Sequence, residues 1–406
     1  MKVLVNAYAC CPGMGSEPGM GWNWCAHLAE HCELFIITEE EFRDRIEAAL
    51  PALPQGANMH FYYNPVTPEV RRMCWNQGDW RFYYYYRKWQ KKTLAIAKKI
   101  VADEGIDLIH QLNMIGFREP GLLWKIEGPR FVWGPVGGME TMPVAYLRGA
   151  GFKTLAFNVV KNVLNYLQCR FQPNVRRAIR KSAVLVSATK SSVDKIRRYH
   201  RRDSVLLNET GCESVGLPVR TVRAGEGFNI VWAGKFDFRK QLGLALRVIA
   251  ECKDLDLKLH ILGTGPDAGA YRSLSSSLGI ADKCVWHGQV ARDEVLDIMA
   301  GSDLFLFTSI MEGTSTVVME AVQNHLPVVC FDACGFGTVV DGSIGRKVRL
   351  SDPERSVKDF AAAVRHMYMH PEELQRMRDN CTAKAAMLEW DRKAEEMYGI
   401  YKSALR

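Results

Sequence analysis

Long apolar runs are missing from this sequence of 406 residues. No stretch reaches the roughly 18–20 apolar residues that a membrane-spanning helix needs, so we expect no transmembrane segment. The chain opens directly on a strand pattern, Lys2 to Val5, and we expect no signal peptide. Metal-ligand spacings are missing too, because the 12 cysteines form no C-x2-C pair and the 10 histidines form no H-E-x-x-H arrangement. We therefore expect buried thiols in a reducing cytoplasm, with no metal and no cofactor.

Acidic residues are scarce in parts of the first half, and the net charge is +8. Between Arg148 and Arg202, fourteen Lys or Arg residues accompany one acid, Asp194, and residues 61–100 hold nine basic residues against two acidic ones. Such an excess favours an anionic partner on that side of the molecule. Nucleic acid is one candidate, but no recognition motif for it occurs, and we expect no nucleic-acid partner.

Two segments combine basic and apolar residues. Residues 75–89 contain eight aromatic side chains, and residues 152–167 place apolar side chains at helical spacing beside Lys153 and Lys161. Basic, amphipathic helices of this kind can lie on an anionic membrane surface. A packed core produces the same pattern, and the sequence leaves both interpretations open.

Strand and helix patterns alternate along the chain, which predicts an α/β fold of parallel sheets covered by helices. The strand patterns of the first half are MKVLVNA, CELFIIT, MHFYYN, DLIHQL, RFVWG, AVLVSA and SVLLNE, and the pattern restarts at Ile230. An apolar content of 48% in a chain of this length allows two domains. We predict one domain over residues 1–219, a linker over 220–227, a second domain over 228–385 and a final helical segment over 386–406.

The most informative segment is residues 309–331, with the sequence SIMEGTSTVVMEAVQNHLPVVCF. It predicts a loop rich in glycine and hydroxyl groups that opens a helix, with Glu312 in the loop and Glu320 in the helix. Free N–H groups at a helix start form an anion site. Two glutamates eight positions apart are common by chance, but an anion site beside two carboxylates suits a nucleotide diphosphate attached to a hydroxyl-rich group.

This segment resembles the E-x7-E signature of the retaining family-4 glycosyltransferases of GT-B fold. Further similar segments are NIVWAGKFDFRKQLGLAL, LKLHILGTGPD, CVWHGQV, DLFLFTS and the opening MKVLVNAYACCPGMGSEPGMGWNW. DLIHQLNMIGFREPG and FVWGPVGG resemble a bacterial branch of the family. The resemblance covers nearly the whole chain. It implies two Rossmann-like domains facing each other across a cleft, the first for the acceptor and the second for the nucleotide sugar, with EWDRKAEEMYGIYKSAL crossing back onto the first.

The resemblance also implies roles on the donor side. Lys235 and Lys240 would stabilise the leaving diphosphate without a metal, although the family more often has arginine at the position of Lys235. Glu320 would bind the ribose hydroxyls, and Glu312 would orient the donor sugar and face the positive charge at its anomeric carbon. The remaining donor-side candidates are Gly15, Ser16, Glu17, Gly19, Gly21, Gly265, Gly313, Thr314, Ser315 and Thr316.

On the acceptor side, His110 ends a strand pattern and could take a proton from an acceptor hydroxyl. A strand-end histidine satisfied by the backbone is an equal alternative, and Leu112 stands where many family members carry a second histidine. The other acceptor-side candidates are Asn113, Arg118, Glu119, Gly137 and Gly138.

One further pattern is discounted. Gly263, Gly265 and Ala268 fit G-x-G-x-x-A, but the pattern follows the second strand of its domain and Pro266 interrupts it, so we expect no NAD site.

Taken together, these features predict a cytoplasmic, metal-independent, retaining glycosyltransferase at the inner face of the membrane. It would move a sugar from a UDP- or GDP-sugar to a glycan or lipid-linked acceptor in bacterial polysaccharide biosynthesis. A glycan phosphorylase or synthase of the same fold, and a non-catalytic relative that binds a glycan or a partner, are the alternatives. The sequence does not name the sugar, the base, the acceptor or the linkage.

Overall fold

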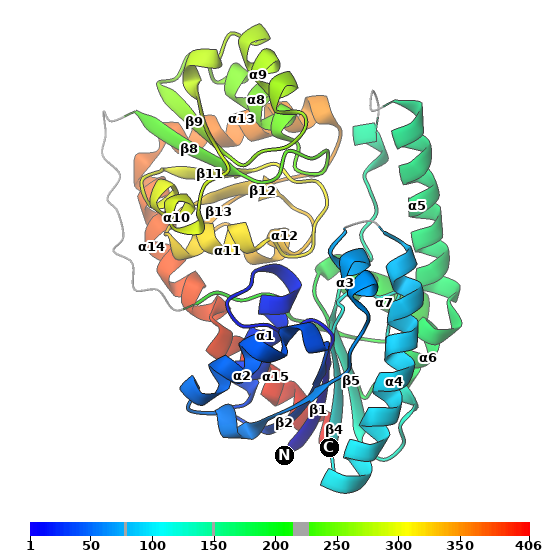
Figure 1. Cartoon of the computed structure of the whole chain (residues 1–406). Helices are drawn as coiled ribbons and strands as arrows, with labels where there is room; N and C mark the ends of the chain where they lie inside the picture. Colours follow the sequence, from blue (N-terminus) through cyan, green and yellow to red (C-terminus); the bar gives the residue numbers. More distant parts are fainter. Residues whose placement is uncertain (77–78, 148–150, 214–226) are drawn as a thin grey trace. The chain divides into compact units, whose positions relative to one another are not determined.

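The computed structural model describes residues 1–76, 79–147, 151–213 and 227–406 (Figure 1). They form two compact units. Unit 1 comprises residues 1–139, 164–211 and 390–406, and unit 2 comprises residues 140–163 and 212–389. Each unit is a parallel sheet covered by helices, and the predicted fold class is confirmed.

The units divide the chain differently from the predicted domains. Residues 140–163 cluster with unit 2, whereas the sequence placed everything up to residue 219 in the first domain. The reason is local packing: Tyr146 donates a hydrogen bond to Ser356 Oγ (2.7 Å), and its ring packs edge-on against Phe331. Of the predicted linker, residues 220–226 lie outside the described residues.

The sheet of unit 1 has seven parallel strands, and all seven predicted strands form. Their order is β3 (Met59–Tyr63), β2 (Glu33–Thr38), β1 (Lys2–Ala7), β4 (Leu108–Asn113), β5 (Arg130–Val136), β6 (Val184–Ser187) and β7 (Val205–Leu206). The central strands are buried along almost their whole length, which is why they read as continuous apolar runs.

Helices cover both faces of this sheet. Helices α1 (Ser16–Leu28) and α15 (Trp390–Leu405) lie on one face, and α4 (Arg81–Glu104) and α6 (Pro173–Lys181) lie on the other (Figure 1). Trp24 and Trp390 join α1 to α15 with ring centroids 5.5 Å apart. The other α-helices assigned wholly or partly to this unit are α2 (Arg43–Ala49), α3 (Pro68–Trp75), α5 (Phe152–Phe171) and α7 (Lys190–His200).

The sheet of unit 2 has six parallel strands. Their order is β10 (Cys284–Gly288), β9 (Leu257–Leu262), β8 (Phe228–Ala233), β11 (Leu304–Phe307), β12 (Val328–Phe331) and β13 (Gly345–Val348). The α-helices that lie wholly in this unit are α8 (Leu242–Glu251), α9 (Ala268–Ser277), α10 (Arg292–Ala300), α11 (Thr316–Gln323), α12 (Phe336–Val339), α13 (Pro353–Met369) and α14 (Pro371–Leu388). Helix α8 packs against α9 and α13, while α11 packs against α10 and α14.

Both sheets reverse their strand order beside the first strand, between β1 and β4 in unit 1 and between β8 and β11 in unit 2. In open parallel sheets, ligands bind at the carboxyl ends of the strands at such a reversal. The loops after these four strands are therefore the places to look for a site. Within the described part of the chain, no helix is long and apolar enough to cross a membrane.

Candidate functional site

In unit 2, hydrogen bonds join the loop after β8 to the loop after β11. The Thr308 hydroxyl donates to the Lys240 carbonyl (2.9 Å) and accepts from Trp232 Nε1 (3.0 Å). The Ile310 amide donates to the Arg239 carbonyl (2.9 Å). These bonds fix both loops at the reversal of the sheet, although they are far apart in the sequence.

Lys240 and Glu312 form an ion pair at this point. The Glu312 carboxylate also accepts a hydrogen bond from the Ser309 hydroxyl (3.0 Å), and the Lys240 ammonium lies 5.2 Å from the centre of the Phe307 ring. Only 15% and 12% of the two side chains are exposed, so bulk water screens the pair weakly. The structure thus brings together two of the residues predicted to act in catalysis.

The hydroxyl-rich segment leads directly into α11. Glu312, Gly313 and Thr314 lie in the loop, Ser315 is the N-cap residue, and Thr316 begins the helix. The Ser315 side chain makes no capping hydrogen bond, so it does not satisfy the free N–H groups of the first turn.

The segment around Gly335 packs against this loop. The Gly335 amide donates to the Gly313 carbonyl (3.2 Å), and a Cβ added at Gly335 would lie 2.0 Å from Thr314 Oγ1. A glycine is therefore required at position 335, and the loop is tightly supported.

Glu320 lies in α11 as predicted, and its carboxylate pairs with Arg292 Nε (3.1 Å) at the start of α10. Burial raises the pKa of Glu320, and the charge of Arg292 opposes that effect. Sequence reasoning missed Arg292. It carries no motif, and its position beside Glu320 arises only from the packing of α10 against α11.

Two other donor-side candidates lie at the carboxyl ends of β8 and β9. The Lys235 side chain is exposed and forms no ion pair or hydrogen bond with the described residues. A Cβ added at Gly265 would lie 2.7 Å from both the Cβ and the carbonyl oxygen of Phe236. Gly265 therefore permits the two loops to pack closely, which accounts for the pattern that mimics a dinucleotide site.

The predicted donor loop over residues 15–21 is in fact mostly helical, because α1 begins at Ser16. Pro18 falls within the first turn, where its missing N–H breaks no hydrogen bond. A Cβ at Gly19 would lie 1.8 Å from the Met14 carbonyl oxygen, and one at Gly21 would lie 2.2 Å from that of Ala9. Gly19 and Gly21 are predicted donor-side residues, and their packing against the chain's own backbone is sufficient to explain both glycines.

Gly15 and Ser16 differ from these two glycines because both are exposed. A Cβ added at Gly15 meets nothing within 4 Å. Ser16 has a φ of 57°, a left-handed conformation that is uncommon for a non-glycine residue. These two residues remain candidates for contact with a ligand.

Glu17 links the two loops at the reversal of the unit 1 sheet. Its carboxylate accepts a hydrogen bond from the Ile115 amide (2.8 Å), beyond the end of β4. Burial raises the pKa of Glu17 to about 7, although the Ile115 amide acts in the opposite direction. The carboxyl group therefore changes its charge near neutral pH.

His110 cannot serve as the predicted base, and this expectation is corrected. The side chain is fully buried, with Nε2 2.6 Å from the Gly134 carbonyl oxygen and Nδ1 2.6 Å from the Tyr401 hydroxyl. A carbonyl only accepts, so Nε2 carries the proton and Nδ1 accepts from Tyr401. Burial lowers the pKa of His110 to about 4. The alternative interpretation, a strand-end histidine whose ring nitrogens are hydrogen-bonded within the protein, is therefore correct.

Asn113 is also unavailable to an acceptor. It is fully buried, and its amide nitrogen donates to the Ala9 carbonyl (2.6 Å) while its amide oxygen lies 3.4 Å from the Ala9 nitrogen. Asn113 therefore joins the ends of β1 and β4, which is a structural role.

Gly137 and Gly138 follow β5. The Gly137 amide donates to the Ile115 carbonyl (2.8 Å), and Gly138 has a φ of 73° that favours glycine. Gly138 is exposed, whereas Gly137 is buried. Of the two, Gly138 is the residue that a ligand could reach.

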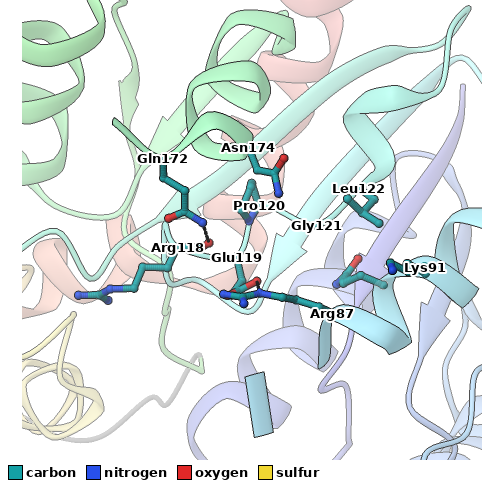
Figure 2. Close-up of a pocket in the computed structure, with 10 residues that line it drawn as sticks. Arg87, Lys91, Arg118, Glu119, Pro120, Gly121, Leu122, Gln172 and Asn174 are labelled. Carbon is teal, nitrogen blue, oxygen red and sulfur yellow. Dashed lines mark hydrogen bonds and ion pairs between the residues drawn. The ribbon is translucent and has the colours of Figure 1, made fainter. Parts of the chain in front are cut away.

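Arg118 and Glu119 line a cavity of about 310 Å³ in unit 1 (Figure 2). Arg87 pairs with the carboxylate of Glu119 through Nε (3.1 and 3.2 Å) and Nη2 (2.5 Å). The Arg118 side chain points away from this pair, while its carbonyl accepts a hydrogen bond from Gln172 (3.1 Å; Figure 2). Both predicted acceptor residues therefore line the cavity, but protein partners already engage their charged groups: Arg87 pairs with Glu119, and the Arg118 guanidinium donates to Gln168 and Asn165.

The described residues contain one group of three possible metal ligands, His27, Glu30 and Asp391. His27 and Asp391 lie 2.5 Å apart and join α1 to α15. Pairing between these helices explains the group, and no ligand role is assigned to it.

Comparison with known sequences adds the family. The model of the glycosyl transferases group 1 matches residues 220–384, the part that contains Lys240, Glu312 and Glu320. This part of the chain is a group 1 glycosyl transferase domain. The chain is 27% identical over 184 residues to the D-inositol 3-phosphate glycosyltransferase of Rhodococcus jostii, covering 43% of this chain and 40% of that protein.

A second relative comes from Campylobacter jejuni. It is the N-acetylgalactosamine-N,N'-diacetylbacillosaminyl-diphospho-undecaprenol 4-alpha-N-acetylgalactosaminyltransferase, 30% identical over 132 residues, which are 32% of this chain and 35% of that protein. The chain thus spans about two fifths or less of the length of these two curated relatives.

Among solved structures, the lipopolysaccharide outer core galactosyltransferase WaaB in its apo form matches 99% of both chains with a TM-score of 0.67 and 12% identity. This likeness concerns the fold alone, and it agrees with a GT-B chain of two Rossmann-like domains.

Proposed function

We propose that the chain is a glycosyltransferase that moves a sugar from a nucleotide diphosphate sugar to a hydroxyl group of a glycan acceptor in bacterial glycan biosynthesis. The observation that carries the proposal is the Lys240–Glu312 pair, held at the sheet reversal of the group 1 domain beside the hydroxyl-rich start of α11. A cation, a carboxylate and free helix amides then surround one point at the carboxyl edge of the sheet.

Each residue has a distinct task in this proposal. As the bond between sugar and diphosphate breaks, negative charge grows on the diphosphate oxygens, and Lys240, Lys235 and the first amides of α11 stabilise it. Glu312 accepts hydrogen bonds from the sugar hydroxyls and faces the positive charge at the anomeric carbon. Glu320 accepts hydrogen bonds from the ribose.

We further propose that the reaction retains the anomeric configuration and needs no metal ion. Fixed lysines and helix amides can meet the charge of the leaving group without reorganising. Glu312 is already bound to Lys240 and Ser309, which suits an orienting role better than nucleophilic attack. Without an enzyme nucleophile, the diphosphate leaves and the acceptor hydroxyl attacks on the same face of the sugar.

The acceptor in this proposal is a lipid-linked glycan at the inner face of the membrane, which the chain contacts peripherally. Support comes from the basic character of residues 148–202 and from the Campylobacter jejuni relative, whose name specifies a diphospho-undecaprenol acceptor. The donor that we propose first is a UDP- or GDP-sugar.

Thermal-shift binding to UDP-, GDP-, ADP- and dTDP-sugars in the presence of a chelator tests the proposal. We expect one nucleotide to raise the melting temperature and Glu320→Ala to abolish that rise. Transfer with the selected donor and a lipid-diphosphate-linked acceptor should then give a product whose anomeric configuration NMR can assign. Absence of any shift across the panel overturns the proposal.

A further inference from the structure

Helix α5 turns its polar side chains toward the protein. Asn158, Asn162, Asn165 and Cys169 recur at helical spacing, and all but the half-buried Asn162 are buried. Asn162 accepts from the Met142 amide (2.9 Å) and donates to the Met142 carbonyl (2.8 Å). Hydrogen bonds therefore hold the inward face of the helix, together with the packing of Leu155 and Cys169 against the hydrophobic cores.

Arg118 fixes the rotation of this helix about its axis. Its Nε donates to Gln168 Oε1 (2.8 Å), and its Nη2 donates to Asn165 Oδ1 (2.7 Å). Both partners are neutral amides, and both lie on the inward face of α5. Turning the helix would break these bonds and leave a half-buried guanidinium without partners.

The outward face of α5 is apolar. Phe152 is 84% exposed, Phe157 is 66% exposed and Phe171 is 52% exposed. The other exposed apolar residues of the helix are Val159, Val160, Val163, Leu164, Tyr166 and Leu167. This arrangement is the reverse of an ordinary surface helix, whose apolar face points to the core. A contiguous exposed apolar face of this kind marks a binding surface.

Cations surround this face, and acids are absent from it. Lys153, Lys161 and Arg170 of α5 are exposed, as are the basic residues of α6, Arg176, Arg177, Arg180 and Lys181. The sequence contains no Asp or Glu from Arg148 to Val193. An apolar face among cations matches an anionic lipid surface, where side chains enter the acyl boundary and cations meet the headgroups. Two copies of the chain placed face to face would instead bring like charges together.

We propose that the exposed face of α5 docks the protein on a membrane that carries anionic lipid, with the helix lying in the plane of the interface. The proposal deepens the proposed function, since it supplies the surface through which the enzyme reaches a lipid-linked acceptor. Docking itself needs neither a nucleotide sugar nor catalysis.

Vesicle flotation of the full chain tests the proposal. We expect binding to vesicles of phosphatidylcholine with phosphatidylglycerol, and at least tenfold weaker binding to phosphatidylcholine alone. A variant with Val160→Ser, Leu164→Ser and Leu167→Ser should lose at least tenfold in binding to the anionic vesicles. Met387→Ser is the matched control, because Met387 is a 70% exposed apolar residue of α14.

The outcomes are separable. Equal vesicle binding by the triple variant and the wild type overturns the proposal, and so does a wild-type dimer that the triple variant dissociates, because a second copy would then cover α5. An unchanged melting temperature confirms that the variant folds. If vesicles bind but no nucleotide sugar does, the proposed function fails while the docking surface stands.

Discussion

The ammonium of Lys240 and the carboxylate of Glu312 form an ion pair between two loops that follow different strands. Hydrogen bonds from Thr308 and Ile310 to residues 239 and 240 hold those loops together. A donor diphosphate would approach a lysine whose position is already fixed, so little reorganisation is needed when charge develops. The pair also means that the two residues cannot be altered independently.

The first prediction concerns Lys240. Lys240→Ala should lower kcat by about 10²–10³-fold, or about 2.7–4 kcal/mol, because one fixed cation facing the diphosphate is lost. Sugar-transfer kinetics at saturating donor measure this change. An unchanged kcat would contradict the role of Lys240.

Glu312 provides the control for that experiment. Lys240→Ala leaves the Glu312 carboxylate mostly buried without its cation, so part of the effect could come from local disorder. Glu312→Gln removes the charge and keeps the shape. The double variant combines Lys240→Ala with Glu312→Gln. If it recovers the melting temperature of the wild type but not its kcat, the loss of kcat belongs to catalysis rather than to folding.

The second prediction separates Glu320 from its partner Arg292. Glu320→Ala should weaken nucleotide binding by about 1.5–3 kcal/mol, the value of hydrogen bonds to a charged group. Arg292→Ala should alter stability by less than about 1 kcal/mol, because 67% of the Arg292 side chain is exposed. Calorimetric titration with the selected nucleotide compares the nucleotide affinities of the two variants. Equal losses of affinity would mean that the ion pair, rather than the carboxylate, is what the nucleotide requires.

The fold could be predicted because its signals are local. Each buried strand of unit 1 is a short apolar run, and helices alternate with the strands, which is enough to predict parallel sheets. The Glu312–Glu320 spacing is equally local, since one loop and the helix that follows contain both residues.

The rest of the site depends on contacts between distant segments. His110 was misplaced because its two partners, Tyr401 and Gly134, come from α15 and β5. Arg292 was missed for the same reason. The outward apolar face of α5 could not be distinguished from core packing, because the spacing of its apolar residues is the same in both cases. The hydrogen bonds of Arg118 and Asn162 and the exposure of the apolar side chains decide between them.

The third prediction distinguishes two glycines of the opening segment. Gly19→Ala should destabilise the protein by about 1–3 kcal/mol, because the new Cβ would overlap the Met14 carbonyl oxygen. Gly15→Ala should change stability by no more than about 0.5 kcal/mol, since nothing lies within 4 Å of its added Cβ. If Gly15 approaches the donor, the same variant should weaken nucleotide-sugar binding. Urea unfolding and thermal shift separate the two effects, and unaltered binding would remove Gly15 from the donor side.

The fourth prediction concerns stability in mild acid. His110 has a folded pKa of about 4, below its ordinary value, so between about pH 6.5 and pH 4 the unfolded chain binds the extra proton and the folded chain does not. The contribution of His110 to the free energy of unfolding is therefore fully present above about pH 6.5 and decreases as the pH falls. Between pH 7 and pH 5 the loss should be about 2 kcal/mol.

Glu17 titrates in the same range with the opposite sign. Its folded pKa of about 7 exceeds its ordinary value, so the folded state takes up the proton first, and stability from this group falls as the pH rises through 7. The measurement should therefore use a Glu17→Gln background, in which the contribution of His110 is isolated. Urea unfolding at pH 7 and pH 5 should show the loss with His110 present and a smaller loss with His110→Gln. If both proteins lose the same stability, the proton is taken up elsewhere and the neutral, buried state of His110 does not control the acid response.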